Sequence, residues 1–224
     1  MLQSLLQRAR EARAAELGDG EGLEEGFTLI ELMVVLLIIA ILLAIAIPTF
    51  LGVTGSASDR ATQSNLTNAL TEAKAVFQNN SSYAGTATTT YSASAPEFAW
   101  NSATTACGAT ATNCVSVENL DLAATSDGLG VAIAAYSQKD NTCWYVADLE
   151  ANPATGVTAG SGDTAFGTPT GATSAGVYYA ELAKGGTKNV ASANINGDCK
   201  ADYAVSTAGI NWFQTYAAAA KAPN

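Results

Sequence analysis

The chain has 224 residues, with 10 Lys and Arg, 20 Asp and Glu and no histidine, so its formal net charge is −10. This length fits one domain, or one domain with an appendage. The acidic balance argues against a nucleic-acid-binding surface, which needs clustered Lys and Arg. The absence of histidine excludes Ser-His-Asp and Cys-His catalysis and removes the commonest transition-metal ligand.

The composition divides the chain into three regions. Residues 1–26 contain three arginines and six acidic residues, whereas residues 27–47 contain a single charge, Glu31. Residues 48–224 are rich in Ala, Thr, Ser, Gly and Asn and carry few charges. We therefore expect a charged leading segment, an apolar segment and one large domain.

Residues 27–47 predict a helix that spans a membrane. At about 1.5 Å per residue they give about 31 Å of helix, which matches one hydrocarbon core. Fifteen of them are Leu, Ile, Val or Phe, and each favours membrane insertion by about 0.3 to 0.6 kcal/mol. Their sum outweighs the insertion cost of a charge such as Glu31, which is about 3 kcal/mol. Most of the nearby basic residues precede the segment, so we expect a cytoplasmic N-terminus.

A secretory signal peptide is the alternative interpretation of this segment. Ala44-Ile45-Ala46 has the small-x-small pattern of a cleavage site. However, the apolar run is longer than the usual 7–15 residues, and the residues before it are net acidic. A retained anchor is therefore favoured.

A short motif marks the start of the apolar segment. Glu25-Gly26-Phe27-Thr28-Leu29-Ile30-Glu31-Leu32 stands before the apolar run, and Pro48 follows it. These residues resemble the class III signal of type IV pilins and type II secretion pseudopilins. The close resemblance covers roughly residues 25–55. The rest of the chain resembles these families only in its general organisation.

The resemblance implies a processing reaction and a set of partners. A membrane aspartyl peptidase would cleave between Gly26 and Phe27, remove residues 1–26 as a leader peptide and N-methylate the new amino group of Phe27. A glycine at the junction suits entry of the backbone into a protease cleft. The expected partners are this prepilin peptidase and methylase, inner-membrane pilus assembly machinery, the lipid bilayer and further copies of the chain, which form a homopolymer. No cofactor, metal or nucleic acid is expected.

Glu31 also has a physical interpretation that does not depend on the resemblance. A carboxylate in lipid needs a partner, and cleavage would leave the ammonium of Phe27 one helical turn away. This ammonium could pair with Glu31 of its own helix or, in a filament, with Glu31 of a neighbour, which would fix the axial register. In the simpler alternative, Glu31 lies at the headgroup interface. The resemblance favours the assembly role.

A helix is expected to continue beyond the apolar segment. Pro48 lacks an N–H and crowds the carbonyl of Ala44, so it predicts a kink, or alternatively a helix stop at the membrane surface. The resemblance favours a kinked segment that loses helicity in a filament. The pattern of polar and apolar residues predicts an amphipathic helix to about residue 80, with a stripe formed by Phe50, Val53, Ala57, Leu66, Leu70, Ala73 and Phe77. Residues 27–80 would thus form one long helix.

Residues 81–224 predict a β-rich extracellular head, and the fold class is α+β: a long helix packed on a small antiparallel sheet. Short apolar runs predict strands at Val131–Tyr136, Cys143–Leu149, Val177–Leu182 and Asp202–Ser206. Tight turns are expected at Gln138–Asn141 and Asn196–Asp198, and exposed loops at Thr86–Tyr91 and Ala154–Ala175.

The head contains all four cysteines, and an even number in an exported domain predicts two disulfides. Three connectivities are open, and we prefer Cys107–Cys114 with Cys143–Cys199. The segment Asn194–Asp202 is faintly like a calcium loop, but it lacks the late Glu and carries Lys200 among the ligand positions, so a polar turn is favoured.

Three classes of function remain. The first is a pilin that polymerises through its N-terminal helix into a type IV pilus on the cell surface. The second is a pseudopilin of a type II secretion or DNA-uptake system. The third, a membrane-tethered enzyme, is disfavoured because no nucleophile with a base and no phosphate-binding loop is found. Adhesion, twitching motility and DNA uptake are all family possibilities.

Overall fold

The computed structural model describes residues 27–108, 112–122, 127–153, 164–165, 172–183, 195–206 and 210–220. The predicted leader, residues 1–26, lies outside the described residues, as does most of the expected loop 154–175. The chain divides into two compact units, one up to Phe50 and the other from Leu51 onward.

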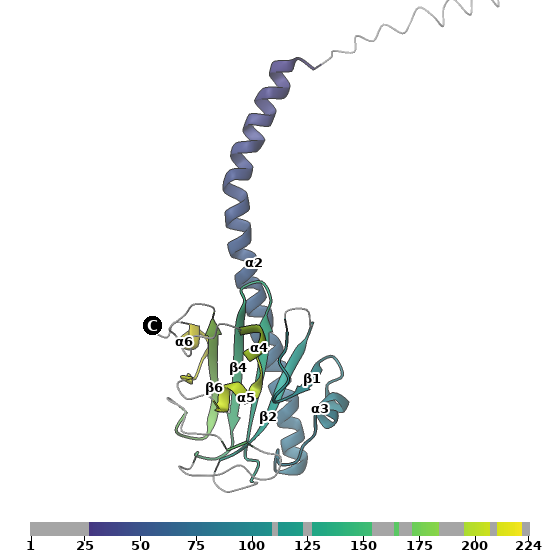
Figure 1. The fold of residues 1–224 in the computed structure, drawn as a ribbon, viewed down its shortest axis with the longest axis vertical. Coiled ribbons are helices and arrows are strands. Elements are labelled where there is room, and N and C mark those ends of the chain that lie inside the picture. The colour runs from purple at the N-terminus through teal and green to yellow at the C-terminus, as the bar shows by residue number, and fades with distance from the viewer. Residues whose placement is uncertain are drawn as a thin grey trace, which may run out of the picture. The chain divides into compact units, whose positions relative to one another are not determined.

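A single helix, α2 (Leu29–Asn80), runs through the expected helical region (Figure 1). Pro48 lies inside α2, so the alternative of a helix stop at this proline is wrong. The hydroxyl of Thr49 donates to the carbonyl of Ala46 at 2.9 Å in the turn around the proline. The helix ends at Asn80, and Ser81, the next residue, has a φ of 56° and donates its N–H to the Phe77 carbonyl at 2.6 Å. A residue in the left-handed region just after the last turn is a common helix terminator.

The buried face of α2 is shorter than the predicted stripe. Its buried residues all lie in the second half of the helix: Gly55, Thr62, Leu66, Ala69, Leu70, Ala73 and Val76. Phe50, Val53 and Ala57 are exposed, so the first part of the predicted stripe is wrong. The residues of the head that cover α2 reach only as far as Gly55, where Asp140 approaches the helix.

The head contains one sheet with the strand order β1-β2-β3-β4-β6, and β5 also pairs with β2. The bounds are β1 Ala99–Ser102, β2 Cys114–Asp121, β3 Gly130–Ser137, β4 Thr142–Leu149, β5 Thr164–Ala165 and β6 Gly176–Ala183. Strands β2, β3, β4 and β6 are antiparallel to their neighbours, as expected, whereas β1 and β5 are parallel to β2. Strands β3, β4 and β6 confirm three of the four predicted strands.

Both faces of the sheet are covered, because apolar residues occupy alternate positions on each side of the strands. Ile133 of β3 and Val146 of β4 belong to one buried cluster with Leu66 and Leu70 of α2. Ala134 and Tyr145, from the same two strands, belong to a second cluster with residues that follow β6. This second cluster includes α4 (Ile195–Asp198) through Ile195, and α5 (Ala201–Ser206) packs against it (Figure 1).

Three local predictions differ from the structure. Asp202–Ser206 forms α5 instead of a strand, and Asn196–Asp198 is part of α4 instead of a tight turn. Helix α3 (Thr88–Ser94) replaces much of the expected loop Thr86–Tyr91. Tyr91 is fully buried and donates its hydroxyl to Asn119 Oδ1 at 2.9 Å. Long-range packing of this kind cannot be recognised in a segment of threonines and serines.

Two disulfides lie in the head, one across a short loop and one across a long loop. Cys107 is joined to Cys114 at the start of β2, and Cys143 of β4 is joined to Cys199, which follows α4. These are the pairs that the sequence analysis prefers. The turn expected at Gln138–Asn141 connects β3 to β4, and Asn141 adopts a φ of 54° there. The last helix, α6 (Tyr216–Ala220), contributes Ala219 to the cluster on the α2 side.

Candidate processing and assembly site

The first turn of α2 is closed by reciprocal hydrogen bonds between Thr28 and Glu31. The Thr28 N–H and hydroxyl both donate to Glu31 Oε2, at 2.9 Å and 2.6 Å. The Glu31 N–H donates back to the Thr28 hydroxyl at 3.3 Å. This is a capping box, which satisfies amide groups that the start of a helix would otherwise leave unbonded.

The capping box holds the predicted assembly residue beside the predicted cleavage junction. Phe27 directly precedes Thr28 and is 83% exposed. Gly26 lies outside the described residues. Glu31 Oε2 already accepts a hydrogen bond from the Thr28 amide. Cleavage would create a free amine on Phe27, one residue before this amide. The arrangement can support pairing of a carboxylate with an ammonium.

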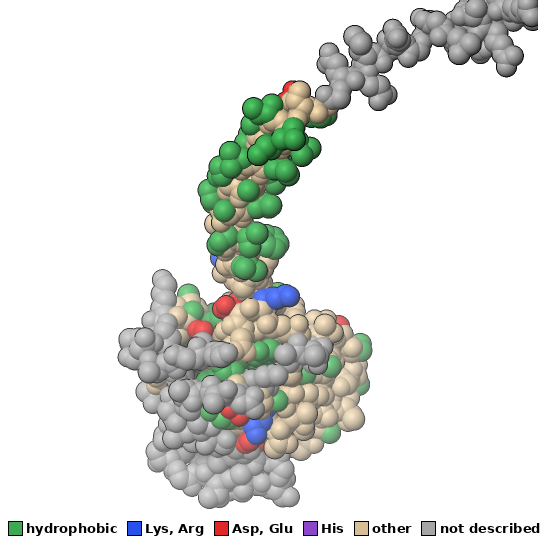
Figure 2. Space-filling model, turned by 45° about the horizontal axis from the view of Figure 1, so that its top comes forward, with side chains coloured by type: hydrophobic (Ala, Val, Ile, Leu, Met, Phe, Trp, Pro, Cys, Tyr) green, Lys and Arg blue, Asp and Glu red, His purple; other side chains and the backbone are tan. Residues whose placement is uncertain are grey.

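The first half of α2 exposes an apolar surface on all sides. Every residue from Phe27 to Val53 is exposed, and hydrophobic side chains cover this part of the helix (Figure 2). The exposed large side chains include Ile30, Leu37, Leu42 and Phe50, the last at 67%. By its length and composition, α2 can cross a membrane. Such a helix needs lipid or other apolar helices around it.

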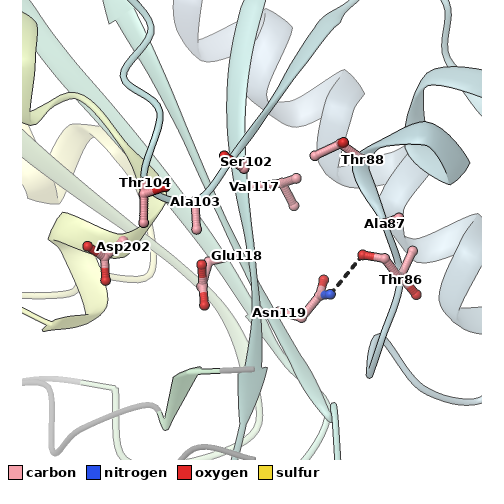
Figure 3. A pocket seen from close by; sticks show the side chains of 10 residues that line it. All are labelled: Thr86, Ala87, Thr88, Ser102, Ala103, Thr104, Val117, Glu118, Asn119 and Asp202. Atoms are coloured by element: carbon pink, nitrogen blue, oxygen red, sulfur yellow. Dashed lines mark hydrogen bonds between the residues drawn. The ribbon is translucent and has the colours of Figure 1, made fainter. Parts of the chain in front are cut away.

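The head contains a polar cleft of about 410 Å³ (Figure 3). Residues 117–119 of β2 form one part of its lining, and residues 86–88, residues 102–104 and Asp202 form the rest. Asn119 donates to the Thr86 carbonyl at 3.0 Å across the cleft. The lining carries hydroxyls and carboxylates.

Thr28 is a residue of the site that was not predicted from the sequence. The signal was present, because a threonine followed three residues later by a glutamate and then by an apolar run is the usual pattern of a capping box. The partner predicted for the Glu31 carboxylate was a cation, the Phe27 ammonium. In the structure, the helix start already gives this carboxylate two donors.

Comparison with known proteins bears on the N-terminal region. Residues 23–47 match the family model of the prokaryotic N-terminal methylation motif. The chain matches no curated protein and no solved structure. The matched range includes the predicted junction, the capping box and the whole apolar segment, residues 27–47. The chain therefore carries the methylation motif that marks the precursors of type IV pilins and pseudopilins.

Proposed function

We propose that this protein is a pilin, a structural subunit that polymerises through the first half of α2 into a type IV pilus filament on the cell surface. The observation that carries the proposal is the combination of the methylation motif at residues 23–47 with a helix whose apolar residues are exposed on every side. A helix that served only as a tether would not need the motif.

Assembly would follow cleavage between Gly26 and Phe27 by a prepilin peptidase and methylation of the Phe27 amine. The mature helix is held in the bilayer until the assembly machinery transfers it to a growing filament. There the lipid around residues 27–53 is replaced by the same residues of neighbouring copies. The transfer exchanges one apolar environment for another, so little hydrophobic free energy is lost.

Glu31 sets the register of this assembly. In the lipid-facing helix its carboxylate is satisfied in part by Thr28. An ammonium on Phe27 of an adjoining copy adds an opposite charge in a low-dielectric environment, where an unpaired charge would be costly. Subunits that are shifted along the filament axis would leave both charges without a partner.

Electron microscopy of filaments sheared from the source cells tests the proposal. We expect filaments that contain this chain in cells with the unaltered gene and processed, membrane-held monomers without filaments for Glu31→Ala. Glu72→Ala, which removes an acid from the same helix outside the apolar segment, is the matched control and should form filaments. Normal filaments from Glu31→Ala cells would contradict the proposal.

A pseudopilin of a secretion or DNA-uptake system is the alternative. Its motif would be the same, and its filament would be short and periplasmic. The two disulfides and the long Ser-, Thr- and Ala-rich head favour a subunit exposed outside the cell. Absence of surface filaments together with failed protein export after deletion of the gene would favour the alternative.

A further inference from the structure

The part of α2 that packs on the sheet contains a short repeat. Residues 66–73 have the sequence LTNALTEA, so the pattern Leu-Thr-x-Ala occurs twice at a spacing of four residues. Both leucines and both alanines are buried, in the cluster that α2 shares with β3 and β4. A shift of the helix by four residues is about 6 Å along its axis, with a rotation of about 40°. It would place a leucine and an alanine where another leucine and alanine lay before, so these side chains fit the sheet at two axial positions.

A polar contact beside the repeat distinguishes the two positions. Lys74 Nζ lies 2.8 Å from Asp148 Oδ1 of β4, and the Asp148 side chain is only 2% exposed. The hydroxyl of Tyr83, a fully buried residue, donates to Asp148 Oδ2 at 3.2 Å. Both oxygens of this buried carboxylate therefore have a donor. Such a pair contributes little net stability, but the loss of one partner is costly, and buried polar pairs are best known for fixing a register.

A shift of one turn would break this contact. If α2 moved towards its N-terminus, Lys74 would enter the place of Leu70, which is 5% exposed, and Asp148 would lose its cation. Two charges would then be buried without partners, which costs far more than the apolar contacts of the repeat could regain. A shift in the opposite direction would bury Glu72 in the place of Val76, which is 4% exposed.

The end of α2 leaves enough chain for the shift towards the N-terminus. The Tyr83 N–H donates to the Gly128 carbonyl at 2.7 Å, so the chain is held to the head three residues after the helix ends. Unwinding of the last turn, residues 77–80, would lengthen the chain by about 7 Å, because an extended residue spans about 3.3 Å and a helical one about 1.5 Å. The second position is therefore within reach, at the cost of one helical turn.

We propose that Lys74 and Asp148 form a latch that holds α2 at one of two axial positions on the head. The pair, with Tyr83 on the second carboxylate oxygen, stabilises the observed position relative to the position one turn away. A pull on the N-terminal part of α2 acts in the direction of the shift, so the latch opposes it. The inference rests on contacts within the unit from Leu51 onward and does not depend on the proposed function.

Two tryptophan indoles provide a probe of the helix position. The indole N–H of Trp144 in β4 donates to Asp59 Oδ1 of α2 at 3.2 Å, so its NMR signal depends on where the helix lies. The indole N–H of Trp100 donates to the Ala95 carbonyl at 3.0 Å, away from α2, and serves as an internal control. Two-dimensional ¹H–¹⁵N NMR of the full chain in detergent micelles resolves both signals.

Removal of both charges of the latch should allow the second position. Lys74→Leu/Asp148→Leu continues the series of leucines at a spacing of four, so the shifted helix would bring a leucine into the place of Leu70. We expect the Trp144 signal of this variant to divide into two while the Trp100 signal stays single. Hydrogen exchange of the amides of residues 77–81 should be faster than in the unaltered chain. Lys74→Arg keeps the cation and is the matched control, with one Trp144 signal.

Three results would overturn the inference. The first is a single, unshifted Trp144 signal in the double variant, since apolar contacts alone would then fix the helix. The second is two Trp144 signals in the unaltered chain, since the pair would not hold one position. The third is division of the Trp100 signal together with that of Trp144, which would show a general loss of packing. Lys74→Leu/Asp148→Asn keeps an acceptor for the Tyr83 hydroxyl and decides the question by the same signals if circular dichroism shows that the first variant is unfolded.

Discussion

Asp140, in the turn between β3 and β4, lies directly against Gly55 of α2. A Cβ placed on Gly55 would come within 3.2 Å of Asp140 Oδ1. The glycine therefore allows the turn to contact the helix near the first residues of the head unit. The same turn is held from a second side, since the Lys139 N–H and the Ser137 hydroxyl both reach the Ser58 hydroxyl, at 3.5 Å and 3.1 Å.

This contact predicts different effects for two glycine substitutions in the same helix. Gly52→Ala should stabilise the helix by about 0.5–1 kcal/mol, because nothing lies within 4 Å of the new methyl group. Gly55→Ala should stabilise it less, or destabilise it, because the methyl group must displace Asp140. Chemical denaturation of the full chain in detergent micelles measures both. Equal gains for the two variants would contradict the contact.

The pair of Asp140 and Asp59 predicts a pH dependence of stability. The pKa of Asp140 is raised by a hydrogen bond with Asp59, by burial and by the charge of Asp59, while the indole of Trp144 donates to Asp59 Oδ1 at 3.2 Å. A raised pKa means that the folded state binds the proton more tightly than the unfolded state. The stability that this tighter proton binding gives to the folded state is complete below the usual Asp pKa of about 3.9. It is lost as the pH rises through the raised pKa of Asp140.

Asp140→Asn should therefore unfold at higher denaturant concentration than the unaltered chain at pH 7, with a difference that shrinks towards pH 4. The amide keeps a hydrogen bond to Asp59 and removes the repulsion between two carboxylates. Neither Lys139 nor Arg60, the neighbouring cations, forms an ion pair with Asp59 or Asp140 among the residues described. Denaturation series at several pH values, with Glu72→Gln as control, measure the effect. A variant whose pH profile parallels that of the unaltered chain would argue against a raised pKa of Asp140.

The two disulfides should contribute unequally to stability. Cys143–Cys199 closes a loop with a sequence separation of 56, and Cys107–Cys114 closes one of only 7. The chain-entropy relation gives about 4 kcal/mol for the longer loop and about 2 kcal/mol for the shorter one. Paired Cys→Ala variants, compared by denaturation in micelles, test the order. Greater destabilisation on removal of Cys107–Cys114 would show that loop entropy does not control the difference.

Thr28 should stabilise the first turn of α2 through its side chain. Thr28→Ala removes the hydroxyl that accepts from the Glu31 N–H and should cost about 0.5–2 kcal/mol of local helix stability. Thr28→Ser keeps the hydroxyl and is the matched control. Hydrogen exchange of the amides of residues 29–31 in micelles reports the change. Exchange that is equally slow in Thr28→Ala would show that the capping box does not hold the helix start.

Periodicity in the sequence predicts the elements that consist mainly of apolar residues. β3, β4 and β6 are runs of apolar residues between polar turns. In the apolar part of α2, the local sequence favours a helix over other structures. β2 was missed because its sequence, CVSVENLD, mixes polar and apolar residues. Most of its polar residues are buried, and their partners lie elsewhere in the chain. Ser116 donates to the Ser102 carbonyl, and the half-buried Asn119 accepts from Tyr91. Such partners become visible only after folding.

The candidate site was more predictable than the head, since its parts are adjacent in sequence. The junction, Glu31 and the apolar run follow from a short motif and from the cost of a charge in lipid. The contact between Lys74 and Asp148 could not be predicted, because 74 residues of sequence separate the two side chains. Only the packing of α2 on the sheet brings them together.

The residue at which the mature chain begins tests the account most directly. Glu31 can set a register only if the amine that it binds lies on Phe27, four residues before it. Mass spectrometry of subunits from sheared filaments should find N-methylphenylalanine at Phe27 as the first residue. Filaments built from subunits that retain residues 1–26, or that begin at any other residue, would contradict the assembly mechanism proposed for Glu31.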